Sequence, residues 1–420
     1  MYLKERLNNG TRVVMERVPS VKSVSVGVWV RAGSRDEEEK EQGIAHFVEH
    51  MFFKGTERRS AQTIAHEIDA LGGELNAFTS RETTTFYVKV LEEHLPKALD
   101  LLADLLRNAR FPVREIEREK QVVLEEIKMV EDDPEDYISD LHTQRLWDKD
   151  PLGRPILGST ETVRSFRRST IRRYLKKHYH PTQTVISVAG NFSVPPVMKL
   201  LNKAFGRSES NGFPLDRRTA PVMEARVTHQ RKPLEQTHFC LGANGLAVSH
   251  PNRYVLYTLN SILGGSMSSR LFQEIREKRG LAYSVYSYLS SYEDAGLLTI
   301  YAAVGSKSFR EAVRLTLRVI REFKKRGITK KEHRTAVSQI KGGLLLNLES
   351  TSNRMSRLAK DEIYFGRQLS VRELIGGIEK VKASQVQRLA NELFDERSLS
   401  LTVLGPVPSK TNLKELISAF

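Results

Sequence analysis

Two histidines and a glutamate lie close together in the segment GIAHFVEHMFFKG. His46 and His50 are four residues apart, and Glu49 directly precedes the second histidine. Residues four apart on a helix share one face, so both imidazoles can bind a single tetrahedral Zn²⁺. Glu49 lies beside that face and can take a proton from water at the metal without binding the metal itself. The spacing therefore indicates a metal site with its own base.

The order HxxEH is the reverse of HExxH and is among the zinc peptidase signatures. The alternative is an ordinary helix whose histidines make minor contacts. This alternative stays open because the chain has 11 histidines, and a short motif can arise among them by chance.

A third ligand favours the metal. Glu126 follows His50 in EIEREKQVVLEEIKMVEDD, where Glu119, Val123, Glu126 and Val130 fall on one helical stripe. Carboxylates on an inward stripe need a partner, and a divalent cation is one. The alternative is that both glutamates lie at the edge of the stripe and pair with Lys or Arg.

The elements that must position these residues follow the same plan in both halves of the chain. Alternation in RVVMERVP, SVSVGVWVRAG and TTTFYVKV, and later in HFCLGANG and LLTIYAAVG, predicts strands. Helical patterns follow in each half, and FPVREIEREKQVVLEEI lines up with ITKKEHRTAVSQIKGGL. We therefore expect an α+β fold of two similar domains, each a mixed, mostly antiparallel sheet covered on one face by helices. A segment rich in Gly, Pro, Ser and charge sets the expected bounds: 1–210 for the N-terminal domain, 211–233 for the linker and 234–420 for the C-terminal domain.

Composition narrows the class of protein. The 420 residues are 40% hydrophobic, which is enough for sizeable cores and excludes a mainly disordered chain. No apolar run approaches the roughly 20 residues of a spanning helix, and MYLKERLNNG lacks the apolar stretch of a secretory signal. The single cysteine, Cys240, fits a reducing cytoplasm and is expected to be a small buried hydrophobe. The net charge of +15 is spread over helices with acids interleaved, so we expect no nucleic-acid partner.

Several motifs together carry a family resemblance. HFVEHMFFKGT, GGELNAFTSRETTTFY and EREKQVVLEEIKMVEDDPED resemble the processing-peptidase branch of the pitrilysin-like zinc peptidases, and HPTQTVISVAGNF and LGGSMSSRLFQEIREKRGLAYSVYS extend the resemblance along the chain. The likeness is to bacterial members and to the catalytic beta subunit of mitochondrial processing peptidase. LGGSMSSRL lacks the long glycine-rich loop of the non-catalytic mitochondrial subunit. The resemblance therefore implies a catalytic chain.

The resemblance assigns roles residue by residue. One Zn²⁺ per chain would be held by His46, His50 and Glu126, with Glu49 as the base and Glu119 as a supporting carboxylate. Asn76, Ala77 and Phe78 match an edge strand along which a peptide adds as a further strand. Arg276 and Tyr283 match a pair in the second half that binds substrate and helps to stabilise the oxyanion. Manganese or cobalt also suits a His₂Glu set.

The second half has no HxxEH, and Gly343 stands at the position that matches Glu126. One domain would then carry the metal, and the other would close over the substrate like a clam around a chamber. Asp136 and Asp140, at i and i+4, match acids that recognise an arginine next to the scissile bond. A solvated acidic turn after a helix is an equal alternative for these two residues.

The expected function is a zinc metalloendopeptidase, cytoplasmic and not inserted in a membrane, that cleaves short or unfolded polypeptides, with basic residues near the bond as one preference. A homodimer is expected, because Arg276 and Tyr283 are in the same chain as the metal motif, and a heterodimer is the alternative. The competing function is a non-catalytic scaffold or core-like subunit that keeps the fold and binds peptides or partner proteins. Loss of His46, Glu49 or another motif residue would have favoured the scaffold.

Overall fold

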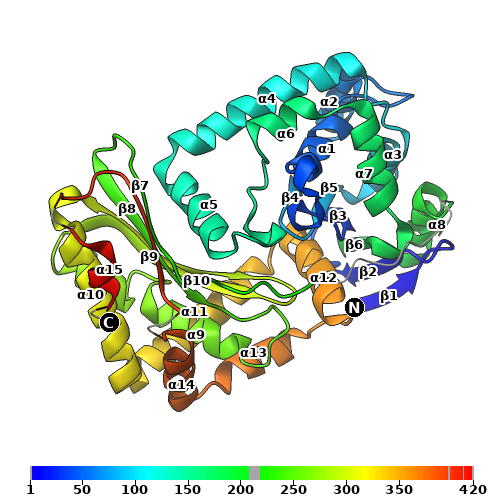
Figure 1. Ribbon diagram of the computed structural model, residues 1–420. Coiled ribbons are helices and arrows are strands. Elements are labelled where there is room, and N and C mark those ends of the chain that lie inside the picture. Colours follow the sequence, from blue (N-terminus) through cyan, green and yellow to red (C-terminus); the bar gives the residue numbers. More distant parts are fainter. Residues whose placement is uncertain (1, 208–217, 396–397, 410, 419–420) are drawn as a thin grey trace. The chain divides into compact units, whose positions relative to one another are not determined.

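The computed structural model describes residues 2–207, 218–395, 398–409 and 411–418 (Figure 1). The chain forms two compact units, each assembled from three segments. The first unit contains residues 1–129, 154–217 and 346–368, and the second contains residues 130–153, 218–345 and 369–420.

The first unit is built on a six-stranded sheet in the order β1-β2-β6-β3-β5-β4. Its strands are β1 (Tyr2–Arg6), β2 (Arg12–Arg17), β3 (Ser23–Val30), β4 (Glu74–Thr79), β5 (Thr84–Leu91) and β6 (Thr184–Gly190). β2 and β6 are parallel, and all other neighbours are antiparallel. β4 is an edge strand, so its outer backbone groups are a template for a further strand.

Helices cover both faces of this sheet. They are α1 (Ile44–Phe52), α2 (Ala61–Ala70), α3 (Leu95–Asn108), α4 (Val113–Asp132), α6 (Thr160–Ser165), α7 (Arg168–His178), α8 (Val194–Phe205) and α12 (Thr351–Phe365), with single turns η1 (Ser34–Asp36), η2 (Glu39–Glu41), η3 (Glu92–His94) and η5 (Pro181–Gln183). Alternation along β3 explains the layers: Val26 and Val28 face the main core, whereas Trp29 packs against Met355 of α12. A Cβ at Gly27 would lie 2.3 Å from the sulfur of Met355, so the close approach of α12 requires glycine there.

The second unit repeats the plan with a five-stranded sheet in the order β7-β11-β8-β10-β9. Its strands are β7 (Val227–Gln230), β8 (Gln236–Asn244), β9 (Ala282–Ser291), β10 (Gly296–Gly305) and β11 (Ser400–Leu404). Its helices are α5 (Pro134–Leu146), α9 (Arg253–Leu263), α10 (Phe309–Arg326), α11 (Lys330–Asn347), α13 (Val371–Glu379), α14 (Ala383–Leu393) and α15 (Leu413–Ser418), with single turns η4 (Pro151–Gly153) and η7 (Ser306–Ser308) and a π-helical segment η6 (Phe272–Glu277). β7 and β11 are parallel and the other pairs are antiparallel, as in β2, β6, β3, β5 and β4 of the first sheet. This repeated order confirms the α+β fold with two similar domains.

Each half of the chain gives one helix to the other half's sheet, and the compact units therefore differ from the expected bounds 1–210, 211–233 and 234–420. α12 covers the second face of the first sheet, and α5 covers the second face of the second sheet, where Ile138 packs beside Cys240. The expectation of helices on one face only is thus corrected: apolar side chains point from both faces of each sheet, and both need cover. Cys240 is buried, as predicted.

The predicted linker contains ordered structure. Its residues 227–230 form β7, which pairs with β11 because their backbone groups complete the second sheet. Residues 211–217 of the predicted linker lie outside the described residues. In the part of the chain that the structure describes, no helix is both long enough and apolar enough to cross a lipid bilayer.

Candidate metal centre

Helix α1 presents His46, Glu49 and His50 on one side because its other side is locked into the core. Ile44, Ala45, Phe47, Val48, Met51 and Phe52 of this helix are all buried. Gly43 precedes the helix in a left-handed conformation, with φ 89°, and a Cβ there would lie 2.4 Å from the carbonyl oxygen of Leu157. The helix therefore starts where only glycine fits, and the ring centroids of the two histidines lie 4.6 Å apart.

Helix α4 brings a carboxylate to these imidazoles. Glu126 Oε2 lies 3.8 Å from His46 Nε2, and Glu126 Oε1 lies 3.7 Å from His50 Nε2. One donor atom from each of the three residues lies within 4.8 Å of the others. The fold thus brings together the three residues that the sequence proposes as ligands.

The distances between the donor atoms suit ligands of one divalent metal better than they suit hydrogen bonds between the donors. Contacts of 3.7 and 3.8 Å are too long for hydrogen bonds, whereas tetrahedral ligands at about 2.0–2.1 Å from zinc are separated by about 3.3 Å. Glu126 Oε2 is buried and has no hydrogen-bond partner among the residues that the structure describes. Burial, and then the charge of His50, lowers the pKa of His46 to about 3, so His46 is neutral and offers a lone pair. The donor set suits Zn²⁺.

Glu119 holds the second histidine from behind. The carboxylate is 3% exposed and accepts a hydrogen bond from His50 Nδ1 at 3.1 Å, which leaves Nε2 free to face Glu126. Lys54 Nζ lies 2.5 Å from the other oxygen of Glu119. Burial opposes the charged form of Glu119, but the bonds to His50 and Lys54 outweigh it and lower the pKa of Glu119. Burial likewise opposes charge on His50. The hydrogen bond to Glu119 and the negative charges of the nearby carboxylates outweigh burial and raise the pKa of His50.

Glu49 is part-buried and is held by a residue of the sheet. Thr79 Oγ1 donates a hydrogen bond to Glu49 Oε2 at 2.5 Å. Burial raises the pKa of Glu49 despite this bond, which favours a group that can accept a proton and later release it. Glu49 thus lies on the same helix as His46 and His50, and its role as the base stays a prediction.

Asn76, Ala77 and Phe78 lie on β4, at the edge of the first sheet. Burial alternates along the strand, so Asn76 and Phe78 are exposed while Ala77 is half-buried. The ring of Phe78 packs edge-on against Trp29, with centroids 5.5 Å apart. The strand therefore has a free edge and an exposed aromatic side chain, and the addition of a peptide strand there stays a prediction.

Arg276 and Tyr283, seven residues apart in sequence, meet in the second unit. The Arg276 guanidinium lies 4.8 Å from the centre of the Tyr283 ring, and Tyr283 is 80% exposed. The π-helical segment η6 carries Arg276 and the start of β9 carries Tyr283. The structure brings this predicted pair together, and its part in substrate binding stays a prediction.

Asp136 and Asp140 lie on α5 of the second unit, in a group of acids. Burial, followed by the charges of Asp133, Glu135 and Asp140, raises the pKa of Asp136. Mutual repulsion of this kind is relieved by a cation. A basic substrate side chain is one such cation, and this specificity also stays a prediction.

Sequence reasoning missed Lys54 and Thr79. Lys54 follows His50 by four residues, which is the helical spacing that could have indicated a shared side. Thr79 ends the segment NAFT, where alternation puts it on the face opposite to Phe78. Neither signal says which carboxylate the side chain meets.

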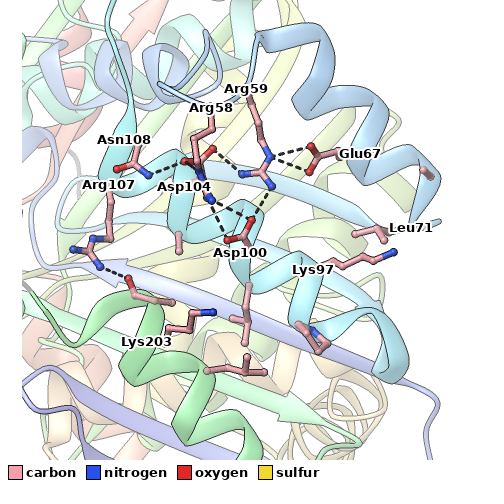
Figure 2. Close-up of a pocket in the computed structure, with 16 residues that line it drawn as sticks. Arg58, Arg59, Glu67, Leu71, Lys97, Asp100, Asp104, Arg107, Asn108 and Lys203 are labelled. Carbon is pink, nitrogen blue, oxygen red and sulfur yellow. Dashed lines mark hydrogen bonds and ion pairs between the residues drawn. The ribbon is translucent and has the colours of Figure 1, made fainter.

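A pocket of about 880 Å³ on the first unit contains none of these site residues (Figure 2). It lies among α2, α3 and α8, and Arg58 and Arg59 cross it to Asp100 and Asp104. These ion pairs fasten the loop after α1 to α3. We interpret this part of the pocket wall as structural, because Arg58 and Arg59 are neutralised by Glu67, Asp100 and Asp104.

Both halves of the chain resemble known proteins. The family described as insulinase (peptidase family M16) matches residues 12–160, and the peptidase M16 inactive domain matches residues 165–340. The chain is 45% identical to an uncharacterized zinc protease of Bacillus subtilis, over 97% of this chain and 98% of that protein. The inactive-domain match fits the lack of HxxEH in the second half.

Solved structures share the whole fold. A structure titled peptidase M16 inactive domain, from Pseudomonas fluorescens, gives a TM-score of 0.91 at 20% identity and covers 98% of this chain and 100% of its own. A chain of complex III2 from Candida albicans gives a TM-score of 0.86 at 21% identity, with 99% of both chains covered. At these identities the likeness shows the fold alone.

Proposed function

The chain belongs to peptidase family M16, and from this premise we propose that it is a zinc metalloendopeptidase that cleaves short or unfolded polypeptides. The observation that carries the proposal is the convergence of His46, His50 and Glu126 donor atoms within 4.8 Å on the first unit. Glu49, on the same helix as the two histidines, supplies a base where these donors meet. One Zn²⁺ per chain is proposed.

The chain's own residues divide the chemistry. Zn²⁺ at the three donors would supply a Lewis acid that polarises the scissile carbonyl and brings the pKa of water to about 7. Glu49 takes the proton of the attacking water and returns it to the leaving amine. Glu119 keeps the proton of His50 on Nδ1, so Nε2 keeps its lone pair for the metal.

Substrate binding follows from the sheet edge. An extended peptide adds to β4 through main-chain hydrogen bonds, which depend little on sequence but require an unfolded or short chain. We propose that Asn76, Ala77 and Phe78 line this position and that Arg276 and Tyr283 contact the substrate from the second domain. Basic side chains near the cleaved bond are the proposed preference.

The test is cleavage of an arginine-containing quenched fluorescent peptide by the wild type and by Glu49→Gln, with zinc measured in both. The wild type should cleave, a chelator should stop it and zinc should restore it. The variant should hold as much zinc and lose about 10²- to 10⁴-fold in rate, because only the base is removed. A wild type that binds zinc and cleaves nothing would favour the scaffold. A wild type without zinc would contradict the donor assignment.

The alternative of a non-catalytic scaffold is weakened by the complete donor set with its base. The Candida albicans likeness supports only a shared fold. The homodimer, with a heterodimer as its alternative, and the cytoplasmic location stay predictions. Light scattering of the purified chain decides the first of these, and fractionation of cells decides the second.

A further inference from the structure

Thr79 joins the proposed substrate strand to the proposed base. It is the last residue of β4, and its hydroxyl donates to Glu49 Oε2 at 2.5 Å. Among the described residues, no other group hydrogen-bonds to the Glu49 carboxylate. This contact is therefore the direct link between the edge strand and the base on α1.

The position of the hydroxyl is set by the backbone. Thr79 pairs with Thr84 of β5, and the turn beyond it is closed by Ser80 N–H donating to Thr83 O at 2.8 Å. Ser34 N–H donates to Ser80 O at 3.2 Å, which anchors the same turn to the loop after β3. Threonine is branched at Cβ and has few side-chain rotamers, so this backbone fixes where its oxygen lies.

A fixed donor matters for a glutamate base. The terminal torsion of glutamate is broad, so a free carboxylate turns through many orientations. The Thr79 bond holds Oε2 and leaves Oε1 to receive a proton. A hydrogen bond to a charged group corresponds to about 10- to 100-fold in rate if it acts on the reacting orientation.

We propose that Thr79 is a positioning residue that holds the Glu49 carboxylate for proton transfer and ties it to the strand that receives the peptide. The inference rests on the proposed function and adds to it a residue whose hydroxyl, among the described residues, hydrogen-bonds to the base and to none of the three metal donors. It predicts that the hydroxyl, rather than the methyl or the strand, carries the effect.

The experiment compares Thr79→Val, which keeps the shape and loses the hydroxyl, with Thr79→Ser, which keeps the hydroxyl. Thr79→Val should lower kcat about 10- to 100-fold with KM and zinc content unchanged. Thr79→Ser should keep kcat within about 3-fold of the wild type, because serine retains the hydroxyl donor. The matched control is Thr228→Val, which removes a threonine hydroxyl from β7, an edge strand of the second sheet, and should leave kcat unchanged.

A second readout does not depend on turnover. In the Glu49→Gln background, fluorescence anisotropy of a labelled peptide measures binding alone. Adding Thr79→Val should leave the peptide Kd and the zinc Kd within about 2-fold. A purely structural role in the strand would instead weaken peptide binding, and an effect on the donors would weaken zinc binding.

The outcomes distinguish failure of the Thr79 role from failure of the proposed function. If the wild type cleaves and Glu49→Gln does not, while Thr79→Val keeps full kcat, the positioning role is wrong and the proposed function stands. If Thr79→Ser is as slow as Thr79→Val, or if the loss appears in KM, peptide Kd or zinc content, the role is also overturned. If the wild type binds zinc and cleaves nothing, the proposed function and the inference fail together.

Discussion

Replacing Asp104 by Asn should destabilise the first unit by about 2 kcal/mol at neutral pH. Asp104 lies on α3 with its side chain fully buried. It accepts four hydrogen bonds, and Figure 2 shows those from Arg58, Arg59 and Asn108. The donors are Thr56 Oγ1 at 2.7 Å, Arg58 Nε at 2.8 Å, Arg59 Nη1 at 2.8 Å and Asn108 Nδ2 at 2.7 Å. An amide in the same place loses the charge that two guanidinium groups face.

The magnitude follows from the pKa. Burial alone would raise the pKa of Asp104, but the bonds from Asn108, Arg59, Thr56 and Arg58 lower it from 3.8 to about 2. The difference between a pKa of 3.8 and one of about 2 corresponds to roughly 2.4 kcal/mol. Because the folded pKa is depressed, this stabilisation is full above the unfolded pKa of about 4 and declines as pH falls toward 2.

The assay must report on one unit, since a chain with two compact units need not unfold in a single step. The sequence has two tryptophans, and Trp29 lies in the first unit while Trp147 lies in the second. In a Trp147→Phe background, Trp29 fluorescence follows urea unfolding of the first unit alone. The free energy of unfolding should fall on Asp104→Asn substitution by about 2 kcal/mol at pH 7 and by about 1 kcal/mol at pH 3.

The matched control is Asp100→Asn. Asp100 lies on the same helix and pairs with the same arginines at 3.2 and 2.7 Å, but its side chain is 50% exposed. Its loss should therefore cost less than about 1 kcal/mol. The reasoning is refuted if Asp104→Asn costs no more than this control, or if the cost of Asp104→Asn is the same at pH 3 as at pH 7.

Three further predictions concern the site. Glu126→Gln should weaken zinc binding by more than the roughly 10- to 100-fold that is typical of groups that only orient a ligand. Glu125→Gln, which changes an exposed neighbour on α4, should leave zinc binding unchanged. A chelator competition measures the zinc affinity of both variants, and equal affinities of the two variants would remove Glu126 from the donor set. The double variant Asp136→Asn and Asp140→Asn should reduce the preference for an arginine peptide over its leucine counterpart by about 3- to 10-fold. The preference is measured as the ratio of kcat/KM for the two peptides. An unchanged ratio would show that these acids are only a solvated turn. Arg276→Leu should lower kcat/KM by about 10²-fold at constant zinc content, and full activity would exclude the residue from substrate binding.

The parts of the site that follow one helix could be predicted from the sequence. His46 and His50 had to share a face once GIAHFVEHMFFKG formed a helix between two glycines, and Glu126 stood out as a carboxylate on an apolar stripe. Strand β3 was equally clear, because valine occupies every second position of SVSVGVWV, and Val24, Val26 and Val28 pack into the main core. Local periodicity fixes these features without knowledge of the rest of the fold.

The parts that depend on packing between distant segments could not be predicted. Alternation in β3 does not say that α12, more than 300 residues later, covers Trp29. In the same way, nothing near Thr79 in sequence shows that its hydroxyl meets Glu49, 30 residues before it. A shift of one residue in the register of β4 would turn Thr79 to the other face, so this contact exists only after the sheet and α1 are assembled.

The second unit, which repeats the fold without the metal donors, indicates why the first unit has them. The second unit builds the same strand order without an HxxEH, and Gly343 on α11, which aligns with Glu126, has open space where a side chain would be. The fold therefore forms without these groups. In the first unit, Glu126 Oε2 and His46 Nδ1 are buried with no hydrogen-bond partner in the described part of the chain, which costs stability. Groups that destabilise a fold able to form without them need a purpose outside folding, and binding of a metal ion gives Glu126 Oε2 the partner that it lacks.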